Sequence, residues 1–199
     1  AVPLDSTTHQ PWYSPEEWAE MRLSSKSHWD VPVQGPNGAV IHILASHPTP
    51  SGFDGVARRN DHRNHDEIQL WVDYLNRAPY IEDDSGRAGG LREGASFVVM
   101  GDLNADPGDP SSFRYAIRRL VGHERVNDVV PTARPARQDG YPDLDPDDTS
   151  TWGNRIDYVL PSATLSVQDA AVWRPDPDAA PDVPVSDHFP VWIDVRAEP

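Results

Sequence analysis

The stretch that decides the fold is residues 95–106, which reads ASFVVMGDLNAD. Its first half is a short apolar run, typical of a buried strand. Asp102 and Asn104 follow it, and side chains two residues apart at a strand end can point into one pocket. The carboxylate can accept a proton or hold water, and the amide can donate to developing negative charge. The alternative is a polar turn that caps the next helix.

A second polar position lies inside the apolar run NRIDYVL at residues 154–160. A buried carboxylate without a partner is costly, so Asp157 needs one, and a histidine is the natural choice. The alternative is a strand-start aspartate paired with the neighbouring Arg155. We expect Asp157 to lie within hydrogen-bond reach of His188.

The third polar position is SDHFPV at residues 186–191, which leads into another apolar run. Adjacent side chains diverge, so Asp187 and His188 are expected to do different jobs. His188 can act on a phosphoryl oxygen while Asp187 faces a hard cation. The alternative is a polar loop ahead of an edge strand.

The remaining segments indicate an α/β protein. Apolar runs predict strands over residues 39–46, 155–160, 165–172 and 189–195. Capped or periodic segments predict helices over residues 14–23, 58–77 and 109–120. Residues 131–150 have almost no apolar side chains, which predicts a long surface loop. Alternating strands and helices over 199 residues indicate one α/β domain, residues 1–199.

Composition excludes several classes of protein. The chain has a net charge of −15, no cysteine and seven tryptophans, which we expect in the core. No apolar stretch is long enough to span a bilayer. Without cysteine there is no disulfide scaffold, Cys-zinc site or thiol nucleophile. The acidic charge argues against broad binding to a phosphate backbone.

The motifs GDLNAD, NRIDYVL and SDHFPV, in this order, resemble the later motifs of the endonuclease/exonuclease/phosphatase superfamily, which includes deoxyribonuclease I. His47 in HILASHPTP resembles a histidine of the deoxyribonuclease-like branch. The resemblance runs from about Tyr13 to the C-terminus and looks closest to a secreted bacterial subgroup. It implies a four-layer α/β sandwich (deoxyribonuclease I-like), an extracellular location and metal-dependent phosphoester hydrolysis.

The resemblance also implies a role for each matching residue. Asp102 would orient or deprotonate the attacking water, and Asn104 would bind the scissile phosphate. Asp102 and Asp187 would hold the divalent metal, with Mg²⁺ expected first and Mn²⁺ or Ca²⁺ as alternatives. Together these residues would position the substrate, hold one hard cation and direct hydrogen-bond donors at the negative charge that develops on the phosphoryl group.

Two histidines complete the implied site. Asp157 would hold His188 in tautomer and orientation, while His188 stabilises the phosphoryl charge or acts as a general acid–base. His47 would contact the phosphate or assist the leaving group. We expect these residues, with Asp102, Asn104 and Asp187, to converge on one pocket.

The chain departs from the family pattern at its start. The family's first two motifs supply an Asn and a Glu, and that Glu is the principal metal ligand. Neither has a match here, because Glu16, Glu17 and Glu20 lie on a capped surface helix. The chain is therefore expected to be the C-terminal portion of the domain, with the N-terminal strands and helices missing. A separate or cleaved N-terminal fragment would be its partner and would be needed for activity.

The substrate class and one rival function stay open. The acidic charge favours a small phosphoester over a nucleic-acid substrate. The rival is a non-catalytic binding or interaction module that retains the fold but lacks the complete metal site. Its only support in the sequence is the missing pair of early motifs.

Three further clusters have more ordinary explanations. His62, His65 and Asp66 are expected at a solvated helix start. The acidic run PDLDPDD at residues 142–148 is expected to be a solvated loop. The arginines after His47 either meet a substrate phosphate or balance nearby acids; they are Arg58, Arg59 and Arg63.

Overall fold

The computed structural model describes residues 3–5, 7–51, 54–110, 113–127, 129–176 and 186–197. The chain forms two compact units. The helical unit comprises Ala1–His28, Ser46–Glu93 and Leu103–His123, and the strand unit comprises Trp29–Ala45, Gly94–Asp102 and Glu124–Pro199. The expected single domain over residues 1–199 stays a prediction.

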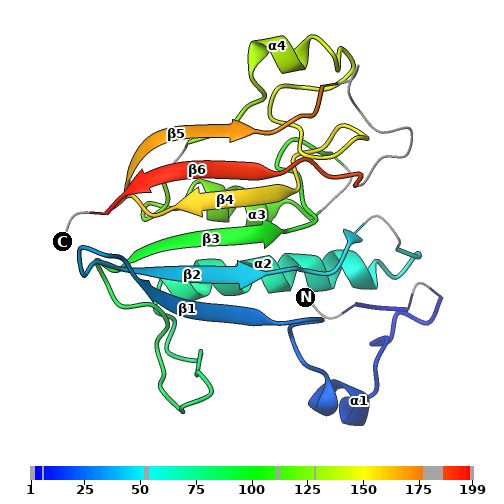
Figure 1. Ribbon diagram of the computed structural model, residues 1–199. Coiled ribbons are helices and arrows are strands. Elements are labelled where there is room, and N and C mark those ends of the chain that lie inside the picture. The colour runs from blue at the N-terminus through cyan, green and yellow to red at the C-terminus, as the bar shows by residue number, and fades with distance from the viewer. Residues whose placement is uncertain are drawn as a thin grey trace. The chain divides into compact units, whose positions relative to one another are not determined.

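The strands of this unit belong to two sheets (Figure 1). The four-stranded sheet has the order β1 (His28–Gln34), β2 (Val40–Ser46), β3 (Ser96–Asp102) and β4 (Asp157–Pro161). The two-stranded sheet pairs β5 (Ser166–Val172) with β6 (Val191–Arg196), and β6 also contacts β4. β3 runs parallel to β2 and antiparallel to β4, and its side chains Phe97 and Val99, two residues apart on one face, are fully buried.

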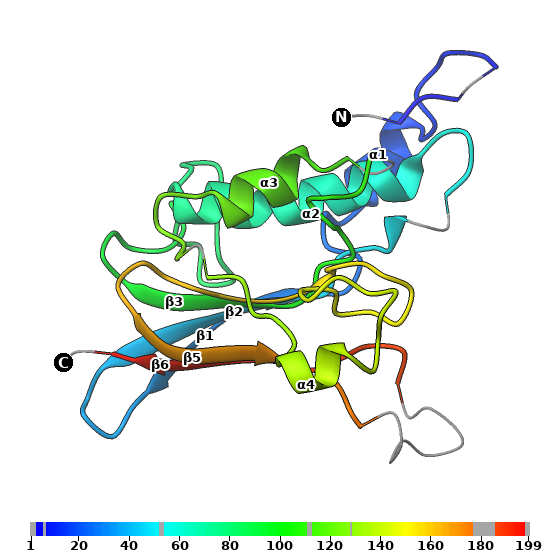
Figure 2. The same ribbon diagram turned by 90° about the horizontal axis from the view of Figure 1, so that it is seen from above.

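The helical unit contains α1 (Pro15–Glu20), α2 (Arg59–Leu75) and α3 (Tyr115–Val121). α2 and α3 lie side by side and contact each other (Figure 2). Their shared core contains buried side chains at helical spacing: Ile68, Trp71, Val72 and Leu75 from α2, and Ala116, Ile117 and Leu120 from α3. The amphipathic pattern predicted over residues 58–77 therefore formed as expected.

α1 has the predicted capping box but is shorter than predicted. The Ser14 Oγ accepts from the Glu17 N–H at 3.2 Å, and the Glu17 carboxylate accepts from the Ser14 N–H at 2.8 Å. The helix ends at Glu20 because no residue of it is buried, so packing does not extend it beyond the capped turn. α3 likewise begins only at Tyr115, later than the predicted residue 109.

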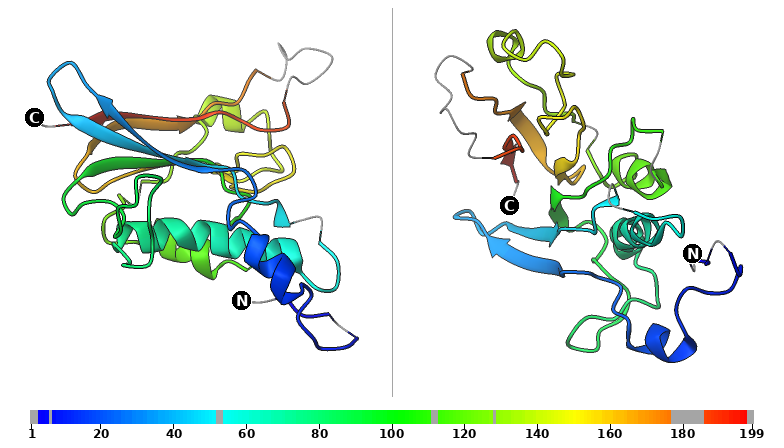
Figure 3. Two further views of the ribbon diagram at one scale, coloured as in Figure 1. Left: turned by 90° about the horizontal axis from the view of Figure 1, so that it is seen from below. Right: turned by 90° about the vertical axis from the view of Figure 1, so that its right-hand side faces the viewer.

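The β1 strand was missed by the sequence patterns. It forms a hairpin with β2, blue in Figure 3, closed by the Gly35 N–H donating to the Ala39 carbonyl at 2.8 Å. Trp29, Val31 and Val33 alternate along β1 but are 61%, 45% and 49% exposed. Pro32 interrupts the run and fits this edge strand, because proline cannot donate to a sheet ladder.

Two other expectations were wrong in part. Residues 131–150 include the short helix α4 (Pro135–Gln138) and end in buried residues, so they are not only a surface loop. The tryptophans are mostly outside the core: Trp71 is buried, whereas Trp12, Trp18, Trp29, Trp152 and Trp173 are between 40% and 61% exposed. No helix of the described residues is both long and apolar enough to cross a membrane.

Candidate active site

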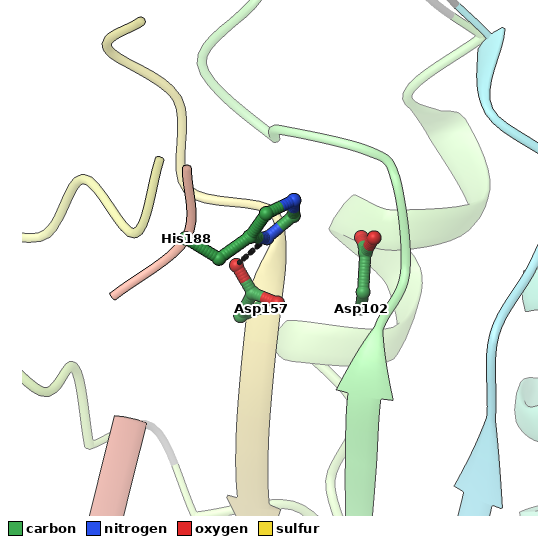
Figure 4. Close-up of side chains that lie close together, drawn as sticks. All are labelled: Asp102, Asp157 and His188. Carbon is green, nitrogen blue, oxygen red and sulfur yellow. Dashed lines mark hydrogen bonds and ion pairs between the residues drawn. The ribbon is translucent and has the colours of Figure 1, made fainter. Parts of the chain in front are cut away.

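Two carboxylates face each other at the ends of β3 and β4. Asp102 and Asp157 are direct partners in the antiparallel ladder. Side chains of opposite residues lie on one face of a sheet, with Cβ atoms about 5 Å apart. Two negative charges at this distance repel each other, and a cation between them would relieve the repulsion. Figure 4 shows both side chains beside the ring of His188.

His188 is hydrogen-bonded to Asp157, as the sequence predicted. The His188 Nδ1 lies 2.9 Å from the Asp157 Oδ2. The Nδ1–H donates to the carboxylate, so a neutral ring carries a free lone pair on Nε2. Nε2 points away from Asp157 (Figure 4). It lies 3.9 Å from the Asp187 Oδ1, and the Asp187 side chain is 72% exposed.

The acidic surroundings favour the protonated form of His188. Burial alone would lower the pKa of this half-buried ring. The hydrogen bond to Asp157 and the charges of Asp157, Asp102 and Asp187 outweigh burial, so the pKa of His188 is raised. A histidine with a raised pKa can donate a proton from Nε2 closer to neutral pH.

Asp102, Asp157 and His188 also form a group that could hold a metal ion. One ligand atom from each lies within 4.8 Å of the other two. One Asp157 oxygen already accepts from His188, and the carboxylate of Asp102, its partner across the ladder, is a second hard ligand. Mg²⁺ is usually bound through one or two carboxylates and several waters, which this donor set can supply.

A buried threonine holds this site together and was missed by the sequence patterns. The Thr149 Oγ1 accepts from the N–H groups of Ile156 and Asp157, both at 3.0 Å. Its carbonyl accepts from the Phe189 N–H at 2.7 Å. Thr149 thereby ties the segment of Asp157 to that of His188. Its partners are backbone groups, which every residue has, so the amino-acid sequence does not indicate these contacts.

An exposed tryptophan also contacts the site. The Trp152 ring lies edge-on to the ring of His188, with centroids 5.4 Å apart and an interplanar angle of 87°. Its place two residues before the NRIDYVL motif was the only sequence signal that could have pointed to it.

The acidic run at residues 142–148 is not simply a solvated loop. The fully buried Arg174 donates to the carbonyls of Asp145 and Asp148, at 2.6 and 2.9 Å. The Asp148 carboxylate is buried and accepts from the Asp145 N–H at 2.7 Å. Burial raises the pKa of Asp148. The expectation of a solvated loop is wrong for its last part, because a buried arginine organises it.

The other two predicted catalytic residues lie in the helical unit. Asn104 has a left-handed backbone (φ 52°), and its side-chain amide donates to the Pro48 carbonyl at 3.1 Å. His47 is exposed, and its carbonyl accepts from the Lys26 ammonium at 3.2 Å. Their convergence with Asp102, Asp157 and His188 stays a prediction.

Two buried side chains of α2 hold the loops that carry these residues. The Asn64 amide donates to the carbonyls of Thr49 and Leu103, both at 2.9 Å. The Glu67 carboxylate, which is fully buried, accepts from the Thr49 N–H at 2.6 Å and from the Ser25 N–H at 2.5 Å. The start of α2 is therefore only partly the solvated segment expected from the sequence.

Known proteins that resemble this chain share its family or its fold. The family model described as "Endonuclease/Exonuclease/phosphatase family" matches residues 10–188. A search of curated proteins found no match. Among solved structures, an endonuclease/exonuclease/phosphatase from Beutenbergia cavernae is 20% identical with a TM-score of 0.53, covering 84% of this chain and 38% of that one. This likeness shows a shared fold.

Two further solved structures have lower TM-scores. The human Nocturnin catalytic domain is 18% identical with a TM-score of 0.47, covering 83% of this chain and 50% of that one. A mannosyl-6-phosphatase from Bacteroides thetaiotaomicron is 16% identical with a TM-score of 0.44, covering 80% and 52%. The chain therefore spans between 38% and 52% of the length of these three structures.

Proposed function

The chain belongs to the endonuclease/exonuclease/phosphatase family, and from this premise we propose that it hydrolyses phosphoesters with the help of a divalent cation. The observation that carries the proposal is the 2.9 Å contact between His188 and Asp157 beside the carboxylate of Asp102. Members of this family act on phosphoester bonds, and these three side chains offer an acid–base group and hard ligands at one sheet end.

In this proposal His188 acts at the phosphoryl group. Its Nε2–H donates to a phosphoryl or leaving-group oxygen, and the raised pKa keeps that proton available. Asp157 fixes the tautomer through Nδ1 and stabilises the charged ring. Asp102 accepts a hydrogen bond from the attacking water and orients it.

The donor set fits a hard divalent cation, Mg²⁺ first and Mn²⁺ or Ca²⁺ as alternatives. Asp102 would hold it, with Asp187 as a second, exposed carboxylate. When bound, the cation would neutralise developing charge on the phosphoryl oxygens. We keep Asn104 and His47 as phosphate-contacting residues on the family resemblance alone.

We further propose that an upstream part of the same domain completes the site with a glutamate ligand. The support is the apolar row of Trp29, Val31 and Val33, which is exposed on the edge strand β1. Exposed apolar rows on an edge strand are a common site of association.

Secretion, also implied by the resemblance, would be tested by locating the natural protein in culture medium.

The test is hydrolysis of bis-p-nitrophenyl phosphate and p-nitrophenyl phosphate by the full natural chain, with Mg²⁺ or with EDTA. We expect turnover that needs the cation and falls about 10²–10⁴-fold in His188→Ala. His42→Ala is the matched control, because His42 forms a similar contact with Asp30 at 2.6 Å.

A different outcome would favour the rival function. The described residues contain one group of potential metal ligands, and it has no glutamate, which is what a non-catalytic binding module would show. Absence of turnover with either substrate and every cation, in a folded full-length sample, would favour that module.

A further inference from the structure

A cavity of about 220 Å³ lies in the helical unit, at the start of α2. The residues that line it include the aromatic residues Tyr13 and Trp18 and the arginines Arg22, Arg59 and Arg63. None of these residues has a role in the proposed hydrolysis. An engineered apolar cavity of about 150 Å³ accepts benzene, so this volume admits a ring with a polar head group.

The aromatic side of the cavity is open to a ligand. The ring centroids of Tyr13 and Trp18 lie 5.8 Å apart, and the angle between the ring planes is 34°. Trp18 is 44% exposed, so part of its apolar surface is not covered by the protein. Aromatic rings bind other flat rings through offset or edge-on contacts.

The basic side is not neutralised by carboxylates. Arg63 donates to the carbonyls of Leu23 and Arg22, at 3.2 and 2.9 Å. The guanidinium of Arg59 lies 4.7 Å from the Trp12 ring centroid and 3.4 Å from the Tyr13 hydroxyl. In the part of the chain that the structure describes, the Arg22 side chain makes no hydrogen bond or ion pair.

The two other ionisable residues of the wall do not cancel this charge. Asp66 accepts from the His65 Nδ1 at 2.9 Å, and although burial opposes its charge, its pKa is lowered. Burial lowers the pKa of His62, so this ring is neutral at pH 7. Among the lining residues, three arginines against one aspartate leave two positive charges, in a chain of net charge −15.

We propose that this cavity binds a small organic anion that carries a flat ring. The ring would lie against Tyr13 and Trp18, and the anionic group would pair with Arg22 and Arg59. Guanidinium groups bind both carboxylates and phosphates in a bidentate manner, so the shared chemistry is an oxyanion on a ring. The inference goes beyond the proposed hydrolysis and does not depend on it.

The test is isothermal titration of the full chain in EDTA with two ring-bearing anions, phenylphosphonate and benzoate. Neither can be hydrolysed at a phosphoester bond, so binding is measured apart from catalysis. We expect at least one of them to bind at least tenfold tighter than methylphosphonate, which lacks the ring, and benzyl alcohol, which lacks the charge. The tighter of the two anions identifies phosphate or carboxylate as the natural head group.

Variants assign the binding to the cavity. Arg22→Gln keeps the backbone carbonyl that Arg63 uses, so the fold should persist, and we expect affinity to fall about tenfold or more. Arg87→Gln is the matched control, because Arg87 pairs with Asp83 and does not line the cavity. The His188→Ala variant should bind both ring-bearing anions with the same affinity as the natural chain. Millimolar or weaker binding of both anions, equal binding of methylphosphonate, or unchanged affinity in a folded Arg22→Gln variant would overturn the proposal.

Discussion

The strand unit contains two histidine–aspartate pairs that resemble each other closely. His188 contacts Asp157 at 2.9 Å, and His42 contacts Asp30 at 2.6 Å, each through Nδ1. The side chains are 30% and 21% exposed in the first pair and 23% and 24% in the second. Distance and burial therefore do not distinguish a candidate catalytic pair from its counterpart.

The surroundings of the two pairs differ. Asp102 lies opposite Asp157 at the end of the sheet and completes a group of three ligating side chains. His42 lies within β2, where its partner on β3 is Phe97. Among the described residues, the pair of His42 belongs to no such group. A histidine–aspartate contact becomes a candidate site through a third polar group at a strand end.

The largest effect is expected from Asp102→Asn, which makes the surroundings of His188 more like those of His42. We expect the phosphoesterase kcat to fall about 10²–10⁴-fold, because a water-orienting carboxylate and a hard ligand are lost together. The Mg²⁺ concentration for half-maximal activity should also rise. Asp30→Asn is the control and should change kcat less than about twofold; equal losses would remove the distinction between the pairs.

The next effect concerns Thr149, which supports only the Asp157 pair. Thr149→Val leaves the buried N–H groups of Ile156 and Asp157 without their acceptor. We expect the free energy of unfolding to fall by about 2–4 kcal/mol, measured by urea denaturation. Thr151→Val is the control, since Thr151 is exposed and donates to Asp187 through its backbone. Equal stability of the two variants would mean that Thr149 does not hold the site.

A smaller effect is expected at Asn104, which lies outside both pairs and has a left-handed backbone. Asn104→Gly and Asn104→Ala both lose the hydrogen bond to Pro48, but only alanine strains the backbone. The free energy of unfolding, measured by thermal unfolding, should therefore be about 1 kcal/mol lower in Asn104→Ala than in Asn104→Gly. If the amide binds phosphate, both variants should lose activity equally. A larger loss in alanine would assign the role to the backbone.

The smallest effect involves a third histidine, His28, whose partner is a carbonyl. Its Nε2 donates to the Glu67 carbonyl at 2.9 Å, and its buried Nδ1 has no hydrogen-bond partner among the described residues. Burial lowers the pKa of His28, and the hydrogen bond to Glu67 only partly opposes this. Its stabilising contribution is therefore present above the ordinary pKa of 6.5 and is lost as the pH falls from there through the folded-state pKa.

This sign gives a direct measurement. His28→Gln retains a donor for the Glu67 carbonyl but cannot be protonated. The drop in melting temperature between pH 7.5 and pH 5 should be smaller in the variant than in the natural protein. An identical drop in both would show that His28 does not contribute to the acid sensitivity.

Much of the strand unit was predictable from residue types. Apolar runs gave β2, β3, β4, β5 and β6 to within about two residues, because buried strands select apolar side chains. The cost of an unpaired carboxylate inside a strand indicated a histidine partner for Asp157, and the family resemblance pointed to His188. The strand β1 did not follow, because it is exposed and contains Pro32.

What holds the candidate site residues was not predictable. Thr149, Asn64, Glu67 and Arg174 all bind backbone groups of segments that are distant in the sequence or carry no motif. Every residue has a backbone N–H and carbonyl, so a sequence pattern cannot identify which of them a buried side chain will bind. The exposed tryptophans likewise show that an apolar residue type does not establish that the side chain is buried.

The most direct test of the account is a double-mutant cycle on the Asp157–His188 pair. The kcat/KM for bis-p-nitrophenyl phosphate with Mg²⁺ is measured in the natural chain, Asp157→Asn, His188→Ala and the double variant. If Asp157 acts through His188, the double variant is no slower than His188→Ala alone. Losses that multiply in the double variant, or a cycle on Asp30 and His42 with the same coupling, would contradict the account.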